Sequence, residues 1–481
     1  MPESRPLPQD FPSSPAGSAA EADWVGTHLL AGESGDVCLF MGGPVTRKEL
    51  AALVVEQEKE LKEAGLRAGG TVALRLPPSV SYVASLCAAW RVGAQVSLLD
   101  HRLASGEVER ALDRLAPQVV VAPRRVSSPA MAGYAEAVTV ISPRPGGRPA
   151  QTRHVLIQLS SGSTGPSKVI ARTADDLIAE LDRYHQLTGY PGAGERIVLL
   201  ASIVHVLGLV GGLLHSLHAG VELVFPSRLT ADGIRAAVAA SERPTMVLGV
   251  PFHAELLTAG QASATLPQLT RMVVAGELVR PGVAEAFMTA YGVPLGTMYG
   301  MTERGVIATD LSGAHRPAVA PAPGMTLRVA DGELLVQTAQ SPYVGLIDPT
   351  RWADGWLHTR DAATIDPQTG LATVLGRLDS QVAVGGLKVD LTEVEQTVAA
   401  VPAVAGAVVA FNDAAIESYL VLAAGSSLAD VEAALADELA PYKRPRRWHV
   451  LTELPRTATG KVVRDRDVLR AAADAATTAA S

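Results

Sequence analysis

The sequence predicts an α/β protein whose larger, N-terminal part is built on parallel-rich β-sheet, with smaller units of other kinds behind it. Short strand-like apolar runs alternate with segments of helical spacing from about residue 48 onward. Hairpin patterns begin after about residue 322, and mixed helices and strands follow from about residue 380. Alternating strands and helices are typical of a parallel sheet covered on both faces, whereas hairpins are typical of antiparallel sheet.

Composition and charge fit this fold class and exclude other classes of protein. The chain has 481 residues, which predicts about two to four domains. It is 48% hydrophobic and 19% charged, so large buried cores can form and general disorder is excluded. The net charge of −8 argues against a nucleic-acid partner, because such binding depends on basic patches that neutralise phosphates.

The first helices and strands follow in quick succession. Residues 48–65 carry apolar side chains at helical spacing and end on Gly65, a typical helix C-cap. A strand at 70–76, a mostly apolar helix at 79–94 and a strand at 95–100 come next. The pattern repeats over 108–122, and further buried strands are expected at 196–202, 221–227, 245–251 and 271–277.

One apolar run, residues 197–221, is long enough to cross a bilayer. It contains three histidines and four glycines, so we expect a buried strand, a loop and a buried helix without membrane insertion. Residues 1–24 have no apolar core and are expected to form a flexible arm rather than a secretory signal. The low-complexity residues 471–481 are expected to be frayed.

The two cysteines, Cys38 and Cys87, stand in no CxxC or Cys/His cluster, so a structural zinc site is not expected. Two buried thiols in a reducing cytosol are the simpler interpretation, and they indicate a cytoplasmic protein.

Two hairpins are expected after the α/β part, over residues 325–339 and 364–376. The remainder predicts a small α+β domain of about 100 residues. Its helices and strands are expected at 391–402, 405–413, 418–425 and 428–440.

A glycine-hinged loop follows the predicted strand ending near residue 159, and it indicates phosphate binding. Its spacing is neither that of a P-loop, G-x-x-x-x-G-K-[ST], nor that of a hydrolase elbow, G-x-S-x-G. Backbone N–H groups, hydroxyl groups and one ammonium can wrap a polyphosphate, although an ordinary Ser/Gly turn is an alternative. The predicted phosphate contacts are Ser160, Ser161, Gly162, Ser163, Thr164, Gly165 and Lys168.

A second stretch, residues 297–305, combines an aromatic side chain, a hydroxyl and a carboxylate within five positions. Tyr299 could stack on a base, Thr302 could donate to phosphate, and Glu303 could hold Mg²⁺, which prefers oxygen ligands. The alternative is a helix start capped by Thr302.

Two later stretches carry further candidates. Asp361 and Arg377 could clamp a ribose diol, and the glycine pair at 385–386 permits close backbone approach. Lys461 lies in a turn-rich loop over residues 455–465, where a lone lysine is usually on the surface.

In this order and spacing, the four stretches resemble those of the adenylate-forming superfamily of acyl- and aryl-CoA synthetases, peptide-synthetase adenylation domains and luciferases. The resemblance runs from about residue 25 to 470 and includes "GGPVTRKELAALV" at 42–54. It implies a large N-terminal domain over 25–376, made of two parallel-rich sheets with helices and a small β-barrel-like subdomain at about 322–376. It also implies a hinge at 377–380 and a small mobile C-terminal domain over 381–470.

The resemblance also implies a two-step activity. A carboxylic acid and ATP give an acyl-adenylate and pyrophosphate, and the acyl group then passes to the pantetheine thiol of CoA or of a discrete carrier protein. Because a carboxylic acid of pKa about 4 is ionised at pH 7, the first step needs charge neutralisation rather than a general base. ATP and Mg²⁺ are the implied cofactors.

The implied roles match the motif residues one by one. The glycine-hinged loop and Thr302 would contact phosphate, Tyr299 would stack on adenine, and Glu303 would bind Mg²⁺. Asp361, with Arg377 beside it, would bind ribose, and Lys461 would be the catalytic lysine of adenylation. The remaining implied roles are Asp379 in the hinge, Gly385 and Gly386 along the thiol tunnel, and Glu277 among the nucleotide contacts.

The chain departs from the family pattern at three places. Ser167 and Val169 flank Lys168 where the family has proline and glycine, and Arg360 replaces the glycine before the ribose aspartate. Leu391 replaces a common proline. No expected charge is lost, so the departures indicate a specialised enzyme of secondary metabolism.

Amino-acid-activating members of the family carry an aspartate near the segment that reads "SIVHVLG" here, and this chain has no acidic residue there. Residues 273–279, "VVAGELV", resemble a variant of aryl-acid ligases. The resemblance therefore implies an aryl or an unsaturated or medium-chain acyl acid as the substrate. Alternatives are amino-acid adenylation, nitrite-dependent diazotisation of an arylamine, a luciferase-like oxygenase and a catalytically silent nucleotide-binding protein. His205 could instead be an ordinary core histidine. The expected pocket residues are His205, Val206, Ala275, Gly276, Gly300 and Met301.

Overall fold

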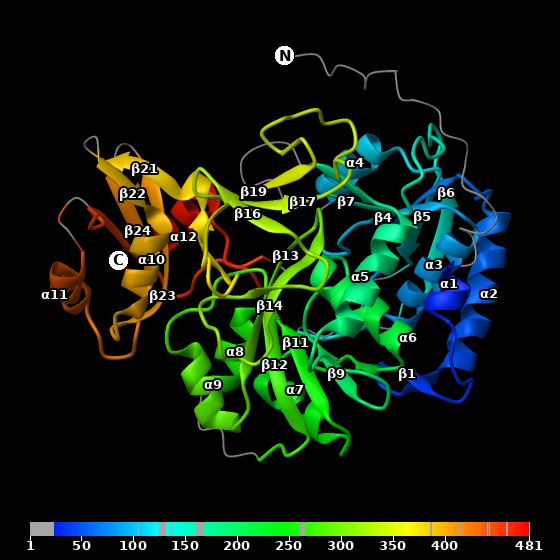
Figure 1. Ribbon diagram of the computed structural model, residues 1–481, viewed down its shortest axis with the longest axis horizontal. Coiled ribbons are helices and arrows are strands. Elements are labelled where there is room, and N and C mark those ends of the chain that lie inside the picture. Colours follow the sequence, from blue (N-terminus) through cyan, green and yellow to red (C-terminus); the bar gives the residue numbers. More distant parts are fainter. Residues whose placement is uncertain are drawn as a thin grey trace.

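The computed structural model contains two large sheets, a smaller antiparallel sheet and a separate C-terminal α+β unit (Figure 1). It describes residues 24–103, 105–124, 131–135, 137–159, 168–259, 265–384, 387–412, 415–439, 441, 443–457 and 460–480. The arm expected at residues 1–24 lies outside this part, except for Trp24, which is buried at the start of α1 (Trp24–His28).

The first sheet has nine strands in the order β15-β14-β13-β12-β11-β9-β10-β1-β2. Its middle is parallel, from β1 through β10, β9, β11 and β12 to β13, and both ends are antiparallel. The strands are β1 (Val37–Phe40), β2 (Pro44–Thr46), β9 (Arg196–Leu199), β10 (Glu222–Val224), β11 (Thr245–Gly249), β12 (Leu269–Ala275), β13 (Leu295–Met301), β14 (Gly305–Asp310) and β15 (Ala320–Pro321).

The second sheet has six strands in the order β6-β5-β3-β4-β7-β8 and is parallel from β5 to β7. Its members are β3 (Thr71–Leu74), β4 (Gln95–Leu98), β5 (Val119–Pro123), β6 (Thr139–Pro143), β7 (Leu156–Leu159) and β8 (Val169–Arg172). The expected α/β class with two parallel-rich sheets is therefore confirmed.

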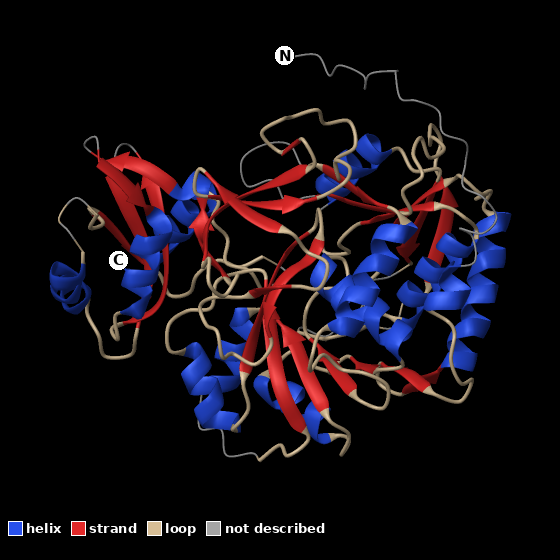
Figure 2. Cartoon of the chain, viewed as in Figure 1, coloured by secondary structure: helices blue, strands red, loops and turns tan. Residues whose placement is uncertain are grey.

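Helices cover these sheets (Figure 2). α2 begins with a capping box between Thr46 and Glu49, which satisfies free N–H groups of its first turn. α3 is buried along its length from Tyr82 to Trp90, as its apolar sequence predicts. The helices are α2 (Arg47–Glu63), α3 (Val80–Arg91), α4 (Ser105–Leu115), α5 (Ala174–Gln186), α6 (His215–Ala219), α7 (Ala231–Ala239), α8 (Pro251–Thr258) and α9 (Val283–Tyr291).

The apolar run at 197–221 folds as predicted, into strand β9, a loop and a buried helix. Its helix opens with a π-helical segment, η2 (Leu207–Leu214), which the sequence pattern did not predict. A Cβ atom at Gly208 would lie 2.3 Å from the Ser202 carbonyl oxygen, so glycine permits this close packing. Among the described helices none is both long and apolar enough to cross a membrane.

The two predicted hairpins form one antiparallel sheet of five strands. These are β16 (Leu327–Ala330), β17 (Glu333–Gln337), β18 (Trp352–Ala353), β19 (Trp356–Ile365) and β20 (Ala372–Arg377). The expected antiparallel character is confirmed, but the sheet is open rather than barrel-like. Within the described residues no ladder joins β16 to β18 or β20.

The C-terminal unit follows η3 (Leu378–Ser380), a short 3₁₀ helix at the expected hinge. It lies at the left of the molecule and has its own apolar core (Figure 1). Its elements are β21 (Gln381–Val384), β22 (Leu387–Asp390), α10 (Leu391–Ala400), β23 (Val404–Asn412), β24 (Ala415–Leu422), α11 (Leu428–Glu438), β25 (Arg447–Val450) and α12 (Arg466–Ala480).

The end that was expected to be frayed, residues 471–481, is helical as far as residue 480, because α12 continues to Ala480. Alanine has the highest helix propensity of the residues. Leu469 and Ala473 on this helix are buried in one cluster with Val408 and Tyr419 of the three-stranded sheet. Packing of one face of α12 therefore stabilises a helix that the amino-acid composition alone does not predict.

Both cysteines are buried and free of disulfides, as predicted. Burial raises the pKa of the Cys38 thiol to about 11 and that of the Cys87 thiol to about 12. Both thiols are therefore protonated and unreactive at neutral pH.

Candidate active site

The candidate site starts where two parallel strands of the first sheet end side by side. β12 and β13 pair in register, with Ala275 opposite Met298. The residues that follow, Gly276 and Glu277, therefore lie next to Tyr299 and its neighbours. Ligands of open α/β sheets bind beyond the carboxyl ends of such strands.

Tyr299, Asp361 and Arg377 form one cluster at this edge. The Tyr299 hydroxyl donates to Asp361 Oδ2 at 2.5 Å, and Arg377 Nη1 donates to Asp361 Oδ1 at 3.2 Å. Asp361 and Arg377 are also directly opposite each other in the β19–β20 ladder. Burial, followed by the Asp361 charge, raises the pKa of Tyr299 well above its usual value, so its phenol remains a donor.

The backbone before Asp361 is held by two hydrogen bonds. The Thr359 hydroxyl accepts from the Asp361 N–H at 3.0 Å, and Glu333 Oε1 accepts from the Arg360 N–H at 2.8 Å. Arg360 has a φ of 64°, in the left-handed region that favours glycine. This explains why the family pattern has glycine at this position. Arg360 therefore adopts a backbone conformation that is strained for a residue with a Cβ atom.

Thr302 and Glu303 lie in the turn between β13 and β14, so the alternative of a capped helix start is wrong. Glu303 Oε1 accepts a hydrogen bond from the Tyr343 hydroxyl at 3.0 Å. The Lys168 ammonium lies 5.8 Å from the centre of the same tyrosine ring. Burial, then the neighbouring Arg351, lowers the pKa of Lys168, while Glu303 opposes this shift.

Behind this turn lies a buried carboxylate, Glu180 of α5, which is fully shielded from solvent. It forms an ion pair with Arg172 of β8 and accepts the Val306 N–H at 2.9 Å. A Cβ atom at Gly305, whose φ is 80°, would lie 2.1 Å from both of its oxygens. Glu180 thus joins the strand that follows Lys168 to the turn that carries Glu303.

Lys461 enters the site from the C-terminal unit. The segment after β25 crosses to the middle of the molecule (Figure 1). A Cβ atom at Gly276 would lie 3.3 Å from Lys461 Nζ, so the ammonium passes directly over this glycine. Glu277 Oε1 accepts the Val462 N–H at 3.2 Å. Burial raises the pKa of Glu277 and Lys461 partly opposes it.

Three further contacts join the C-terminal unit to the N-terminal part. Arg280 Nη1 donates to the Ala405 carbonyl oxygen at 2.6 Å. The Arg456 guanidinium lies 4.4 Å from the centre of the Phe252 ring and 3.9 Å from a Glu255 carboxylate oxygen. These contacts hold the unit in the orientation that brings Lys461 to the site.

His205 lies in the turn before η2, where its carbonyl oxygen accepts the Leu209 N–H at 2.8 Å. Its side chain is exposed, so it is not an ordinary core histidine. Surrounding protein nevertheless lowers its pKa to about 4, and the Lys461 charge adds to this shift. The imidazole is therefore neutral at pH 7 and can contact an uncharged part of a substrate.

The other expected pocket residues fall into two groups. Gly276 lies beneath Lys461 and directly follows Ala275, and Val206 directly follows His205. Gly300 and Met301 end β13, and a Cβ atom at Gly300 would lie 2.5 Å from the Gly305 carbonyl oxygen. Gly300 is therefore required by the hairpin itself.

Several predicted residues cannot be placed. The loop residues Ser160, Ser161, Gly162, Ser163, Thr164 and Gly165 and the tunnel residues Gly385 and Gly386 lie outside the described part of the chain. Asp379 lies in η3, where only its backbone is described.

In the described part of the chain, no group of three or more His, Cys, Asp or Glu side chains could hold a metal ion. Mg²⁺ does not require such a group, because it is commonly bound by one or two carboxylates together with substrate phosphates. Glu303 fits this role, since the Tyr343 hydrogen bond fixes one oxygen and leaves the other for a ligand.

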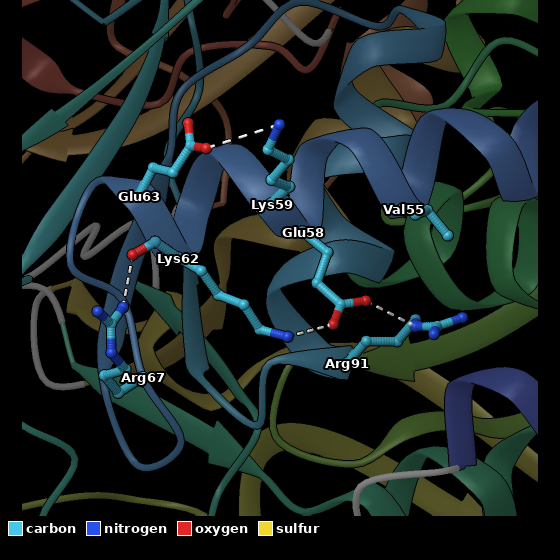
Figure 3. Close-up of a pocket in the computed structure, with 7 residues that line it drawn as sticks. All are labelled: Val55, Glu58, Lys59, Lys62, Glu63, Arg67 and Arg91. Carbon is cyan, nitrogen blue, oxygen red and sulfur yellow. Dashed lines mark hydrogen bonds and ion pairs between the residues drawn. The ribbon is translucent and has the colours of Figure 1, made fainter.

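A surface depression elsewhere on the molecule is not part of this site. It lies on α2, the loop after α2 and the end of α3. Glu58 pairs with Lys62 and Arg91, Lys59 pairs with Glu63, and Arg67 donates to the Lys62 carbonyl oxygen (Figure 3). The depression is lined by Val55, Glu58, Lys59, Lys62, Glu63, Arg67 and Arg91.

Comparison with known proteins identifies the family. The model of the AMP-binding enzyme family matches residues 31–342, and that of the AMP-binding enzyme C-terminal domain matches 393–461. This chain belongs to the AMP-binding enzyme family. Tyr299 and Glu303 lie within the residues that the first of these models matches.

Several members of the AMP-binding family are similar along most of the chain. A p-hydroxybenzoic acid–AMP ligase of Mycobacterium tuberculosis, FadD22, is 28% identical over 84% of this chain, which spans 62% of that protein. A feruloyl-CoA synthase of Amycolatopsis is 28% identical over 88% of this chain and 93% of its own length. The crystal structure of the anthranilate CoA ligase AuaEII with anthranoyl-AMP superposes with a TM-score of 0.79 at 21% identity, covering 95% and 98% of the two chains.

Motif reasoning missed Tyr343, Glu180 and Gly305. Each acts on a residue far away in sequence, so local spacing gave no signal for it. The positive φ that Gly305 adopts after "TER" could have been inferred from the turn, but the carboxylate it faces could not.

Proposed function

We propose that this protein joins a carboxylic acid to ATP, giving an acyl-adenylate and pyrophosphate, and then transfers the acyl group to a pantetheine thiol. The observation that carries the proposal is the position of Lys461, which lies over Gly276 and beside the ends of β12 and β13. A mobile surface lysine would not be held in this way between two units of the chain.

In the first step of the proposed reaction, each of the site residues has a separate role. Tyr299, Asp361 and Arg377 hold the nucleoside, and Lys168 steadies the β- and γ-phosphates. Mg²⁺ bound by Glu303 would neutralise charge on the triphosphate as pyrophosphate leaves. Lys461 meets the carboxylate and the α-phosphate oxygens, where two anions approach each other. Fixed cations of this kind stabilise the charge that develops in the transition state.

We propose an aryl or an unsaturated acyl acid as substrate. The neutral His205 and the apolar or small residues Val206, Ala275, Gly276 and Met301 offer no charge to an α-amino group. The named relatives, which act on p-hydroxybenzoate, ferulate and anthranilate, support an aromatic acid. Residues 377–380 are the proposed hinge for the second step, and Gly385 and Gly386 the proposed lining of the thiol path.

The test is Lys461→Ala. Loss of one such cation costs about 2.7–4 kcal/mol of barrier, so hydroxylamine-trapped adenylation of an aryl-acid panel should fall roughly 100- to 1000-fold. Transfer from a preformed acyl-adenylate to CoA or a phosphopantetheinylated carrier should remain, because Lys461 acts only in the first step. Lys59→Ala, on the exposed face of α2, is the matched control. Near-normal adenylation by Lys461→Ala would overturn the proposal.

A further inference from the structure

Tyr343 joins two loops of the site that are far apart in sequence. It belongs to the loop between β17 and β18, whereas Lys168 precedes β8 and Glu303 lies in the β13–β14 turn. Its hydroxyl donates to Glu303 Oε1 at 3.0 Å, and its ring centre lies 5.8 Å from the Lys168 ammonium.

The backbone of Tyr343 is fixed to the strand that follows Lys168. Tyr343 pairs with Ile170 in an antiparallel bridge. The Pro342 carbonyl oxygen accepts the Ala171 N–H at 2.9 Å, and the Val169 carbonyl oxygen accepts the Val344 N–H at 3.0 Å. Val169, unusual for the family, therefore takes part in this pairing, where a β-branched residue is favoured.

The side chain of Tyr343 is 8% exposed, so its orientation is set by packing. Burial, followed by the charge of Glu303, raises the pKa of its phenol above the usual value, and the hydroxyl remains a donor at all relevant pH values. A donor held against a carboxylate favours the ionised form of that carboxylate and fixes its orientation.

We propose that Tyr343 is a positioning residue that orients the Glu303 carboxylate for Mg²⁺ and holds the Lys168 ammonium beside the triphosphate. This inference rests on the proposed function, since it concerns the metal and phosphate end of the same site. In this proposal the Tyr343 hydroxyl orients Glu303, and the Tyr343 ring holds the Lys168 ammonium. The two parts can therefore be removed separately.

The test compares Tyr343→Phe, which keeps the ring, with Tyr343→Leu, which removes both parts. Binding of ATP is measured by calorimetry with Mg²⁺ and with EDTA, in the absence of acid and thiol. Loss of an outer partner of a metal ligand typically lowers metal affinity about 10- to 100-fold. We expect Tyr343→Phe to raise the Mg²⁺ concentration for half-maximal ATP binding about tenfold and to leave metal-free ATP binding unchanged. Tyr343→Leu should weaken metal-free binding as well, because Lys168 loses the aromatic face.

Tyr190→Phe is the matched control, because Tyr190 is also 8% exposed and its hydroxyl donates to a carbonyl oxygen, that of Gly211, at 2.8 Å. It should leave the Mg²⁺ dependence unchanged. An unchanged Mg²⁺ dependence in Tyr343→Phe, or an equal loss with and without metal, would overturn the inference. Because the binding assay contains no acid, its result is separate from the trapping assay that tests acid activation.

Discussion

At the scale of single residues, Arg360 shows how this chain departs from its family without losing the site. Its positive φ places a side chain where glycine is favoured, and Glu333 holds its N–H in that conformation. The conformation in turn directs Asp361 toward Tyr299 and Arg377. The backbone geometry is therefore retained although the residue that usually provides it is absent.

Replacing Arg360 by glycine and by alanine should separate the effect of backbone strain at residue 360 from the effect of losing the guanidinium charge. Both variants lose the guanidinium, but only alanine keeps the Cβ atom that disfavours a positive φ. We expect Arg360→Gly to be more stable than Arg360→Ala by roughly 1 kcal/mol in urea unfolding. Two variants of equal stability would show that residue 360 adopts another conformation in solution.

At the scale of secondary-structure elements, the sequence predicted what local patterns encode. The strand expected at 70–76 is β3 (Thr71–Leu74), and the helix expected at 79–94 is α3 (Val80–Arg91). The π-helical start at Leu207 depends on glycines that fit against Ser202 and Tyr184, which are contacts of tertiary structure. Glu180 and Tyr343 were missed for the same reason, because their partners are 126 and 40 residues away.

Glu180 provides a test of how α5, β8 and β14 are held together. Glu180→Gln keeps the shape but leaves Arg172, which is 2% exposed, without its charge partner. Breaking a buried ion pair costs about 3–5 kcal/mol, so denaturant unfolding should show a loss of that order. Asp113→Asn, which breaks an exposed ion pair with Arg144, should change stability much less. Equal effects of the two variants would contradict the buried role of Glu180.

At the scale of the whole molecule, the proposed site includes Lys461 only because the C-terminal unit is docked. Glu277, Arg280 and Phe252 of the N-terminal part contact the loop of Lys461 and the neighbouring β23. All of these contacts are polar or involve a charge, and interfaces of this kind favour relative motion of the units. The docked orientation is the one that suits the first step of the proposed reaction.

Acid should destabilise the whole fold through two buried histidines. Burial lowers the pKa of His215 and of His253 to about 4 each, so the unfolded chain binds more protons between about pH 4 and pH 6.5. Stability is therefore fully present above about pH 6.5 and is lost as pH falls toward 4, by about 1.4 kcal/mol per pH unit for each histidine.

Urea unfolding at pH 7, 6 and 5 measures this slope. In His253→Asn the amide oxygen can accept the Val250 N–H that His253 Nδ1 accepts at 3.1 Å. This variant should show a shallower dependence on pH. Curves parallel to those of the wild type would exclude His253 as a source of the effect.

The burial of both cysteines has a practical consequence for observing the enzyme at work. A cysteine introduced at a solvent-exposed position would react with a maleimide dye while the two native thiols stay protonated and inaccessible. Met288 on α9 and Val450 at the end of β25 are 46% and 43% exposed and lie on opposite sides of the interface between the units. A donor and an acceptor dye at these two positions would show whether the C-terminal unit rotates during the reaction, in a chain that keeps its native thiols.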